Sequence, residues 1–267
     1  MSEIKNKVIW ITGASSGIGE ALAYQIAEKG GKLILSARRE NELQRVKDNC
    51  KGINPDEIKI LPLDLNQPDT LPILAQEAIS LFGTVDILIN NGGVTQRSLA
   101  VETSSEVERI IMEVNFFAAI TLSKSVLTVM KKQQSGHLVI ISSVAGKVAT
   151  KMRSSYAASK HALQGYFDSL RAEVWQDNIK VTLICPGYVK TSISLNAFTA
   201  EGAKYNQMDK NQELGISVDV CAQKILQAIE KDQEEIYIAR KEMIAVYLKR
   251  FFPGILSKIV KNIKVGN

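Results

Sequence analysis

Short apolar runs alternate with longer segments of mixed polarity along most of this chain. The apolar runs predict buried strands, at residues 7–12, 32–37, 57–61, 85–89, 137–142, 180–185 and 235–239. In the segments between them, apolar residues recur at helical spacing and predict helices, at residues 18–29, 38–51, 71–82, 104–131, 154–175 and 218–229. Strands separated by helices favour a parallel sheet with both faces covered. The predicted fold is an α/β, Rossmann-like, doubly wound parallel sheet of about seven strands.

The chain has 267 residues, of which 45% are hydrophobic, and it shows no linker, repeat or low-complexity segment. This composition suffices for one buried core, so we expect a single Rossmann-type domain over residues 1–239. Residues 192–215 form a connection longer than a compact domain needs, and such segments often act as lids over a substrate. A disordered loop is the alternative interpretation.

The net charge of +5 is concentrated at the C-terminal end. Residues 240–267 contain seven basic side chains and one acidic side chain, and the rest of the chain is nearly neutral. A neutral core argues against nucleic-acid binding. The three cysteines, Cys50, Cys185 and Cys221, are widely spaced and suggest neither a disulfide framework nor a metal site. Without a visible export signal or a long apolar span, a cytoplasmic location is expected.

The tail, residues 240–267, also has an amphipathic pattern. Its apolar stripe contains Ile255, Leu256, Ile259, Val260 and Ile263, and the opposite side carries Lys258, Lys261 and Lys264. A basic amphipathic helix can lie in a membrane interface. It can equally pack against a partner subunit or against its own domain, and the sequence leaves these three roles open.

A glycine-rich turn, Thr12-Gly-Ala-Ser-Ser-Gly-Ile-Gly19, connects the first predicted strand to the first predicted helix. This arrangement is typical of a site that holds a dinucleotide pyrophosphate at a helix N-terminus. Because the spacing differs from the usual G-x-G-x-x-G fingerprint, a tight connection without a ligand is the alternative.

Small and polar residues also follow three later strands. They are Asn90-Asn91-Gly92-Gly93, Ser142-Ser143-Val144-Ala145-Gly146 and Pro186-Gly187-Tyr188-Val189-Lys190-Thr191. Ligands of open parallel sheets bind outside the carboxyl ends of the strands. Together with the glycine-rich turn, these loops predict one ligand site at that edge.

Tyr156 and Lys160 lie four residues apart in an alanine-rich helical segment, so their side chains are expected on one helix face. A nearby ammonium favours the phenolate form of a tyrosine, and in a partly dry site such a phenol can exchange protons near neutral pH. Tyr237 and Lys241 have the same spacing, but no other catalytic signal surrounds them.

These features together resemble the short-chain dehydrogenase/reductase family. The matching positions are Thr12-Gly13-x-x-x-Gly17-x-Gly19, Asn90-Asn91-x-Gly93, Asn115, Ser143, Tyr156-x-x-x-Lys160 and Pro186-Gly187, in family order and spacing. They span roughly residues 7–191. At Gly92 the family usually has alanine, and we expect this departure to loosen the turn more than to alter the chemistry.

The resemblance implies hydride transfer between a nicotinamide and a carbonyl or alcohol. Tyr156 would be the general acid in reduction and the general base in oxidation. Lys160 would lower the pKa of this tyrosine and bind the nicotinamide ribose, and Ser143 would hydrogen-bond the substrate oxygen. Asn115 would hold a water that feeds a proton relay through Lys160.

The resemblance also implies the cofactor contacts. The pyrophosphate would be lined by Gly13, Ser15, Ser16, Ile18 and Gly19, and the adenine by Asp64 and Leu65. The adenosine ribose would contact Asn91 and Gly92, and the carboxamide would contact the loop of Pro186, Val189 and Thr191. Contacts of the cofactor with Tyr156 and Lys160 would complete the set. The tip of the second strand has Arg38 and Arg39 and lacks the acid that would bind a ribose 2′-hydroxyl. Arginines can grip a 2′-phosphate, so NADP(H) is the expected cofactor, with a solvated arginine pair as the alternative.

The expected function is an NADP(H)-dependent oxidoreductase for a small-molecule carbonyl or alcohol. The lid offers Leu195, Phe198, Tyr205 and Met208, which suits a lipophilic substrate. A catalytically silent, nucleotide-binding regulatory protein is the alternative, although the four intact catalytic positions argue against it. The resemblance to hydroxysteroid and retinol-type members suggests peripheral membrane contact through the tail, and the family suggests a homodimer or homotetramer.

Overall fold

The structure is a computed structural model that describes residues 3–262. Its strands are β1 (Val8–Thr12), β2 (Lys32–Ser36), β3 (Ile58–Ile60), β4 (Ile87–Asn90), β5 (Gly136–Ile141), β6 (Ile179–Pro186) and β7 (Glu235–Ile238). Its helices are α1 (Gly17–Glu28), α2 (Glu40–Asn49), α3 (Leu71–Phe82), α4 (Ser105–Met112), α5 (Ala118–Gln133), α6 (Ser154–Val174), α7 (Lys210–Glu213), α8 (Val218–Glu230), α9 (Glu242–Phe251) and α10 (Pro253–Asn262). Every predicted strand and helix is present, with ends shifted by a few residues.

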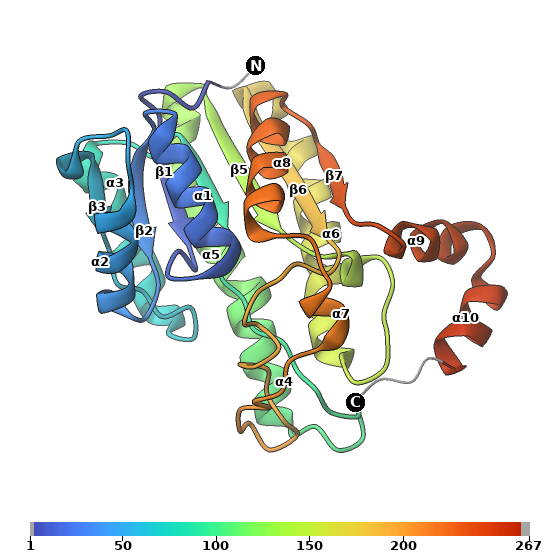
Figure 1. Cartoon of the computed structure of the whole chain (residues 1–267). Coiled ribbons are helices and arrows are strands. Elements are labelled where there is room, and N and C mark those ends of the chain that lie inside the picture. Colours follow the sequence, from blue (N-terminus) through green and yellow to red (C-terminus); the bar gives the residue numbers. More distant parts are fainter. Residues whose placement is uncertain (1–2, 263–267) are drawn as a thin grey trace.

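The strands form one parallel sheet in the order β3-β2-β1-β4-β5-β6-β7 (Figure 1). The chain starts near the centre at β1, runs to the β3 edge, and returns through β4 to fill the other half. This order leaves a crevice at the carboxyl ends of β1 and β4, where the direction of winding changes. The predicted fold class is confirmed.

Both faces of the sheet are buried, because successive side chains of each strand point to opposite sides. Ile9 and Ile11 pack in a cluster with α1, α2 and α8, whereas Trp10 packs in a cluster with α3, α5 and α6 on the other face. Every residue of β1 is buried. Uninterrupted apolar runs are the pattern expected of central strands in parallel sheets, which is why the sequence identified them.

The segment Ser105–Gln133 is long and apolar enough, by length and composition, to cross a membrane. It consists of α4, a π-helical turn at Glu113–Phe117, and α5. Seven residues of α5 are buried, and its apolar side chains pack in the same cluster as Leu88 and Leu138 of the sheet. The segment is therefore apolar because it packs in the core of the domain.

The tail begins with α9 and α10, which extend away from the sheet beyond β7 (Figure 1). Leu256 is buried, whereas Ile255 and Ile259 are 52% and 45% exposed. The predicted apolar stripe is therefore divided between an inner and an outer side of α10. Ile263 and Lys264, which completed the predicted pattern, lie outside the described residues.

Candidate active site

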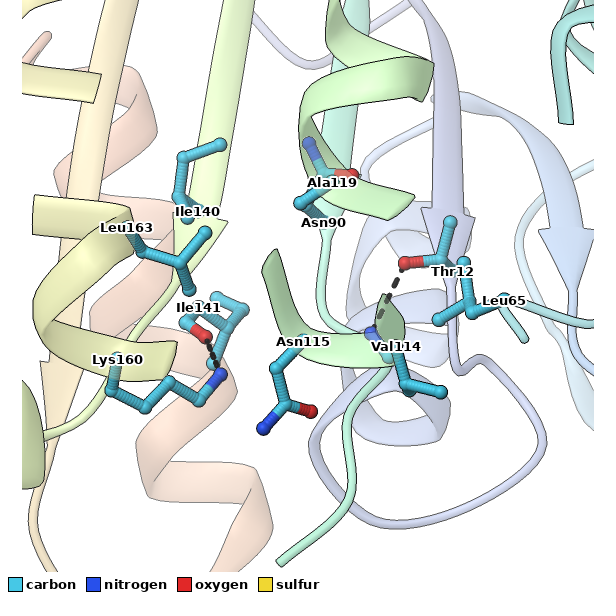
Figure 2. Close-up of a pocket in the computed structure, with 11 residues that line it drawn as sticks. Thr12, Leu65, Asn90, Val114, Asn115, Ala119, Ile140, Ile141, Lys160 and Leu163 are labelled. Atoms are coloured by element: carbon cyan, nitrogen blue, oxygen red, sulfur yellow. Dashed lines mark hydrogen bonds between the residues drawn. The ribbon is translucent and has the colours of Figure 1, made fainter. Parts of the chain in front are cut away.

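The predicted catalytic groups come from one helix, α6, and from two other segments at the carboxyl edge of the sheet. Tyr156 and Lys160 lie in the first two turns of α6, Ser143 follows β5, and Asn115 lies in the π-helical turn before α5. Figure 2 shows the side chains of Lys160 and Asn115 at one small cavity, which both residues line. The fold thus brings together residues that are separated by up to 45 positions in the sequence, from Asn115 to Lys160.

The Tyr156 phenol is half-buried and makes a hydrogen bond with the Ser143 hydroxyl. Burial raises the pKa of Tyr156, while this hydrogen bond and the positive charges of Arg153 and Arg97 act in the opposite direction. Ser143 also donates to the Pro186 carbonyl at 3.3 Å. The serine is therefore held next to the phenol at the end of β6.

Lys160 is almost fully buried, and its ammonium donates to the Ile141 carbonyl at 2.7 Å. The ammonium lies 5.9 Å from the centre of the Tyr156 ring. Burial lowers the pKa of Lys160 to about 8. Because the pKa of Tyr156 is raised, the lysine loses its proton before the phenol does as pH rises. With a pKa of about 8, Lys160 still carries most of its positive charge at neutral pH, next to a phenol whose ionisation is opposed by burial.

Asn115 is fixed by the loop after β4. Its Oδ1 accepts from the Val94 N–H at 2.8 Å, and its Nδ2 donates to the Ser159 hydroxyl at 3.0 Å. The cavity beside it has a volume of about 10 Å³, and Asn90 and Lys160 also line it. The buried Oδ1 of Asn90 has no hydrogen-bond partner among the described residues. About one water fits such a volume, so the cavity has the size and polarity that the expected proton relay needs.

The first turn of α6 is held by Gln96, a residue that sequence reasoning missed. Its Oε1 accepts from the backbone N–H groups of Ser155 and Tyr156 at 3.0 and 3.2 Å. A helix cannot satisfy its first N–H groups internally, so this side chain acts as a distant cap. Capping by side chains is recognised in sequences only when the two residues are close together, and Gln96 is 60 residues from Tyr156.

The predicted lid, residues 192–215, is folded against the loop after β4. Backbone hydrogen bonds of 2.8 and 2.9 Å join Phe198 to this loop. Asp209 accepts hydrogen bonds from Arg97 at 2.9 Å and from Arg153 at 2.8 Å. The segment is thus hydrogen-bonded rather than a disordered loop. The ion cluster of Arg97, Arg153 and Asp209 is a second feature that the sequence did not reveal, because its members are 56 and 112 residues apart.

The glycine-rich turn after β1 is clamped to the loop after β4. Asn91 Nδ2 donates to the carbonyls of Thr12 and Gly13 at 3.0 and 3.1 Å, and Thr12 Oγ1 accepts from the Gly92 N–H at 3.1 Å. Gly13 has a φ of +66°, and a Cβ on Gly19 would overlap the Gly13 carbonyl. Glycine is required at both positions, and the resulting cradle at the start of α1 fits a phosphate group.

The remaining predicted cofactor residues lie along the same edge. Two of them, Ser15 and Val189, are buried, Ile18 packs against the core, and Ser16 is exposed at the start of α1. Along the chain, Asp64 and Leu65 follow β3, and Pro186 is the last residue of β6. Arg38 and Arg39 are exposed at the tip of β2, and Arg39 reaches the Ser15 hydroxyl at 3.5 Å. Arg39 therefore faces the glycine-rich turn.

A second cavity, of about 400 Å³, opens between the glycine-rich turn and the lid. Gly17 and Thr191 line it from the side of the predicted cofactor site, and Met208 and Gln212 line it from the lid. The Thr191 hydroxyl accepts a hydrogen bond from Gln212 at 2.9 Å. The predicted lid thus borders an open cavity next to the residues expected to hold the nicotinamide end of a dinucleotide.

The second tyrosine and lysine pair with the same spacing is placed differently. Tyr237 lies on β7 and Lys241 precedes α9, so the two side chains do not share a helix face. Burial and a hydrogen bond to Glu235 raise the pKa of Tyr237. Nothing in this arrangement favours proton exchange near neutral pH.

Known proteins share both the sequence and the fold of this chain. A family model described as short chain dehydrogenase matches residues 7–202. A Drosophila melanogaster protein, dehydrogenase/reductase SDR family protein 7-like, is 41% identical over 258 residues, which cover 95% of this chain and 79% of that protein. Dehydrogenase/reductase SDR family member 7B of Bos taurus is 39% identical over 263 residues, which cover 96% and 81%. The crystal structure of a short-chain dehydrogenase from Streptomyces avermitilis has a TM-score of 0.79 at 25% identity and covers 96% of both chains.

The doubly wound sheet and the phosphate cradle define a dinucleotide-binding α/β protein. The chain belongs to the short-chain dehydrogenase/reductase family. It is accordingly an oxidoreductase that acts on CH–OH or C=O groups with a nicotinamide cofactor, NAD or NADP. The family expected from the sequence motifs is confirmed.

Gly92 departs from the family pattern for a steric reason. Its φ does not require glycine, and its N–H is bonded to Thr12, so the expected loosening of the turn is not observed. A Cβ at this position would instead collide with the Leu65 side chain. Glycine here makes room for Leu65, a predicted contact of the adenine.

We expect Gly92→Ala to lower the free energy of unfolding by less than about 1 kcal/mol, because the added methyl group meets only the end of the half-buried Leu65 side chain, which can rotate away. Urea denaturation of the wild type and the variant measures this cost. Leu65→Ala removes the obstructing side chain and serves as the matched background. The same cost of Gly92→Ala in both backgrounds would contradict the steric explanation.

Proposed function

We propose that this protein transfers hydride between NADP(H) and a carbonyl or secondary alcohol of a lipophilic small molecule, with Tyr156 as the general acid and base. The observation that supports this proposal best is the half-buried Tyr156 phenol, which is hydrogen-bonded to Ser143 and lies next to the buried Lys160. A phenol and a hydroxyl that face the same point can both contact one substrate oxygen.

The chain's own groups divide the reaction between them. In reduction Tyr156 donates its proton to the carbonyl oxygen, and in oxidation it accepts the hydroxyl proton. Ser143 donates a hydrogen bond to the same oxygen and stabilises the charge that develops there. Lys160 and a water in the small cavity beside Asn115 would return the proton to the phenol. A nicotinamide bound at this site would supply or accept the hydride.

A preference for NADP(H) follows from the charges around the adenosine end of the site. The β2 tip carries Arg38 and Arg39, and Arg39 already faces the glycine-rich turn through Ser15. Guanidinium groups make paired, charge-assisted hydrogen bonds with phosphate oxygens. Both arginines are exposed, so a 2′-phosphate would reach them without displacing a buried contact.

The apolar surface of the tail suggests where the enzyme meets a lipophilic substrate. Tyr247, Phe251, Phe252 and Ile255 of the tail are each more than half exposed, and lysines and arginines stand beside them on α9 and α10. Such a surface can bind an anionic membrane. We propose a cytoplasmic homodimer or homotetramer in which residues 240–267 are an addition to the catalytic domain of residues 1–239 and contact a membrane surface peripherally.

The catalytic proposal predicts that Tyr156→Phe lowers kcat/KM about 10²- to 10⁴-fold, because the proton donor and acceptor is lost. A panel of lipophilic ketones and alcohols assayed with NADPH or NADP⁺ measures the change, and the Kd for NADPH should stay within about twofold. Tyr237→Phe is the matched control and should leave activity unchanged.

Retention of most activity by Tyr156→Phe would contradict the proposed role of Tyr156 as general acid and base. If the wild type binds NADPH tightly but turns over nothing in the panel, the silent regulatory function is the better interpretation.

The cofactor proposal predicts that Arg38→Ala/Arg39→Ala raises the Kd for NADPH about 10- to 100-fold and leaves the Kd for NADH nearly unchanged. The loss corresponds to about 1.5–3 kcal/mol for hydrogen bonds to a charged group. Fluorescence titration measures both constants, with Lys51→Ala/Lys132→Ala, which removes two exposed positive charges elsewhere, as a charge-matched control. Equal affinities of the wild type for NADH and NADPH would rule out the preference.

The membrane proposal predicts that Phe251→Ser/Ile255→Ser lowers partition onto vesicles containing phosphatidylserine at least about tenfold, because two large apolar contacts are lost. Sedimentation with vesicles measures it, and Val101→Ser, at another exposed apolar residue, is the control. Unchanged partition, also after deletion of residues 253–267, would count against membrane contact. A loss of the oligomer instead would indicate a subunit interface.

A further inference from the structure

Glu242, the first residue of α9, is the single acidic side chain of residues 240–267. Its carboxylate reaches back to the body of the domain. The Oε1 atom accepts a hydrogen bond from the Tyr188 N–H at 3.0 Å, and the Oε2 atom accepts one from the Arg240 N–H at 2.9 Å. The contact with Tyr188 spans 54 residues. The tail is therefore attached, where it begins, to the loop after β6.

The loop after β6, residues 187–191, lies between the catalytic groups and the glycine-rich turn. Directly before it, the Pro186 carbonyl accepts from the Ser143 hydroxyl at 3.3 Å. At its end, the Thr191 methyl group lies 3.2 Å from the position that a Cβ on Gly17 would take. This is the loop expected to hold the nicotinamide carboxamide. Its position therefore decides where a nicotinamide can lie relative to the catalytic groups.

Within residues 187–191, backbone carbonyls of neighbouring segments hold two N–H groups, and a side chain holds a third. The Tyr188 N–H is the one held by a side chain, that of Glu242. The next N–H along the chain, that of Val189, has no hydrogen-bond partner among residues 3–262 and is available to a ligand. The two backbone bonds join the Gly187 N–H to the Ile238 carbonyl and the Lys190 N–H to the Ile216 carbonyl, each at 2.9 Å.

Gly187 leaves room for this carboxylate. A Cβ at Gly187 would lie 2.7 Å from Glu242 Oε1 and 3.1 Å from the Cβ of Ala239. The φ of Gly187 is not positive, so glycine is needed here for space rather than for backbone conformation. The glycine of the Pro186-Gly187 motif and the acid of the tail therefore fit each other.

The Glu242 side chain is charged at neutral pH. Burial acts to raise its pKa, but hydrogen bonds from backbone N–H groups and the positive charge of Arg240 outweigh burial, so the pKa of Glu242 is lowered. Hydrogen bonds from N–H groups to a carboxylate are stronger than those to a neutral acceptor. The hold on the Tyr188 N–H is therefore stronger than a neutral side chain would provide.

We propose that Glu242 is a positioning residue for the nicotinamide end of the cofactor: its carboxylate fixes the Tyr188 N–H, and with it the neighbouring Val189 N–H, where the carboxamide binds. The proposal rests on the proposed function, in which this loop holds the nicotinamide. The first turn of the tail then belongs to the cofactor site, although α9 and α10 extend away from the sheet (Figure 1).

Binding of two nucleotides, one with and one without the nicotinamide, tests this proposal without a substrate. Isothermal titration calorimetry of the full chain gives the Kd for NADPH and the Kd for ADP-ribose 2′-phosphate, which has the same adenosine end and pyrophosphate but lacks the nicotinamide. If the wild type prefers NADH, the pair of NADH and ADP-ribose makes the same comparison.

Glu242→Ala is expected to raise the Kd for NADPH about 3- to 10-fold and to leave the Kd for ADP-ribose 2′-phosphate within about twofold, because only the nicotinamide end loses its support. Glu242→Gln keeps an acceptor for the Tyr188 N–H and should recover part of the affinity. The matched control is Glu230→Ala, which breaks an ion pair of 2.7 Å with Lys29 at the end of α8 and should change neither Kd. Far-UV circular dichroism shows whether each variant is folded.

An equal rise of both dissociation constants in Glu242→Ala would show that the carboxylate supports the fold as a whole, and no rise would show that the loop keeps its place without it. Glu242→Gln with no more affinity than Glu242→Ala would assign the effect to the charge of the tail rather than to the contact. Equal affinities of the wild type for the two nucleotides would show that the loop does not hold the nicotinamide. Each of these results overturns the proposal.

Gly187→Ala tests the same contact from the other side, and also serves if Glu242→Ala does not fold. The added Cβ pushes the carboxylate off the loop, so the same selective loss of NADPH affinity is expected, and an unchanged Kd would contradict the proposal. Failure of the wild type to turn over any substrate defeats the proposed function but leaves these dissociation constants unaffected, so the two failures are distinguishable.

Discussion

A single buried amide, that of Gln96, joins the loop after β4 to the helix that carries Tyr156 and Lys160. The amide is completely buried, and its carbonyl oxygen takes the two N–H groups of Ser155 and Tyr156. A buried amide without partners would cost several kcal/mol, as would unpaired N–H groups at the helix end. Both costs are avoided only when α6 has one orientation relative to the sheet and one rotation about its own axis. That constraint fixes where the phenol and the ammonium lie relative to the sheet edge.

Burial of the site has two opposing consequences for its chemistry. It strengthens every polar contact around the substrate oxygen, but it also penalises charge, which raises the pKa of Tyr156 and lowers that of Lys160. With a pKa of about 8, Lys160 nevertheless keeps most of its positive charge at neutral pH. This positive charge, 5.9 Å from the centre of the Tyr156 ring, acts against the effect of burial on the phenol.

Apolar composition has different meanings in different parts of this chain. The most apolar long helical segment, Ser105–Gln133, packs on the sheet and contributes to the core. Less apolar segments at the C-terminal end expose large side chains such as Phe251 and Phe252. Exposed aromatic groups beside basic ones need a partner more than a buried apolar helix does. Hydropathy alone would single out Ser105–Gln133, a core helix, and not the segments that expose these aromatic side chains.

The sequence by itself determined the features that depend on local periodicity and on motifs within one loop. Alternating apolar strands and amphipathic helices predicted the sheet, the glycine-rich turn predicted the phosphate cradle, and the spacing of Tyr156 and Lys160 placed both on α6. Spacing did not separate this pair from Tyr237 and Lys241, whose residues lie on a strand and before a helix. The two pairs differ only in the secondary structure that carries them.

The tertiary structure alone decided what depends on contacts between distant parts of the chain. The cap of α6 by Gln96 spans 60 residues, and the ion pair of Arg97 with Asp209 spans 112. The glycine at position 92 makes room for Leu65, a neighbour 27 positions earlier in the chain. Burial and charge at a given atom are sums over such distant neighbours. The positions of the catalytic groups could therefore be predicted from the sequence, but their protonation states could not.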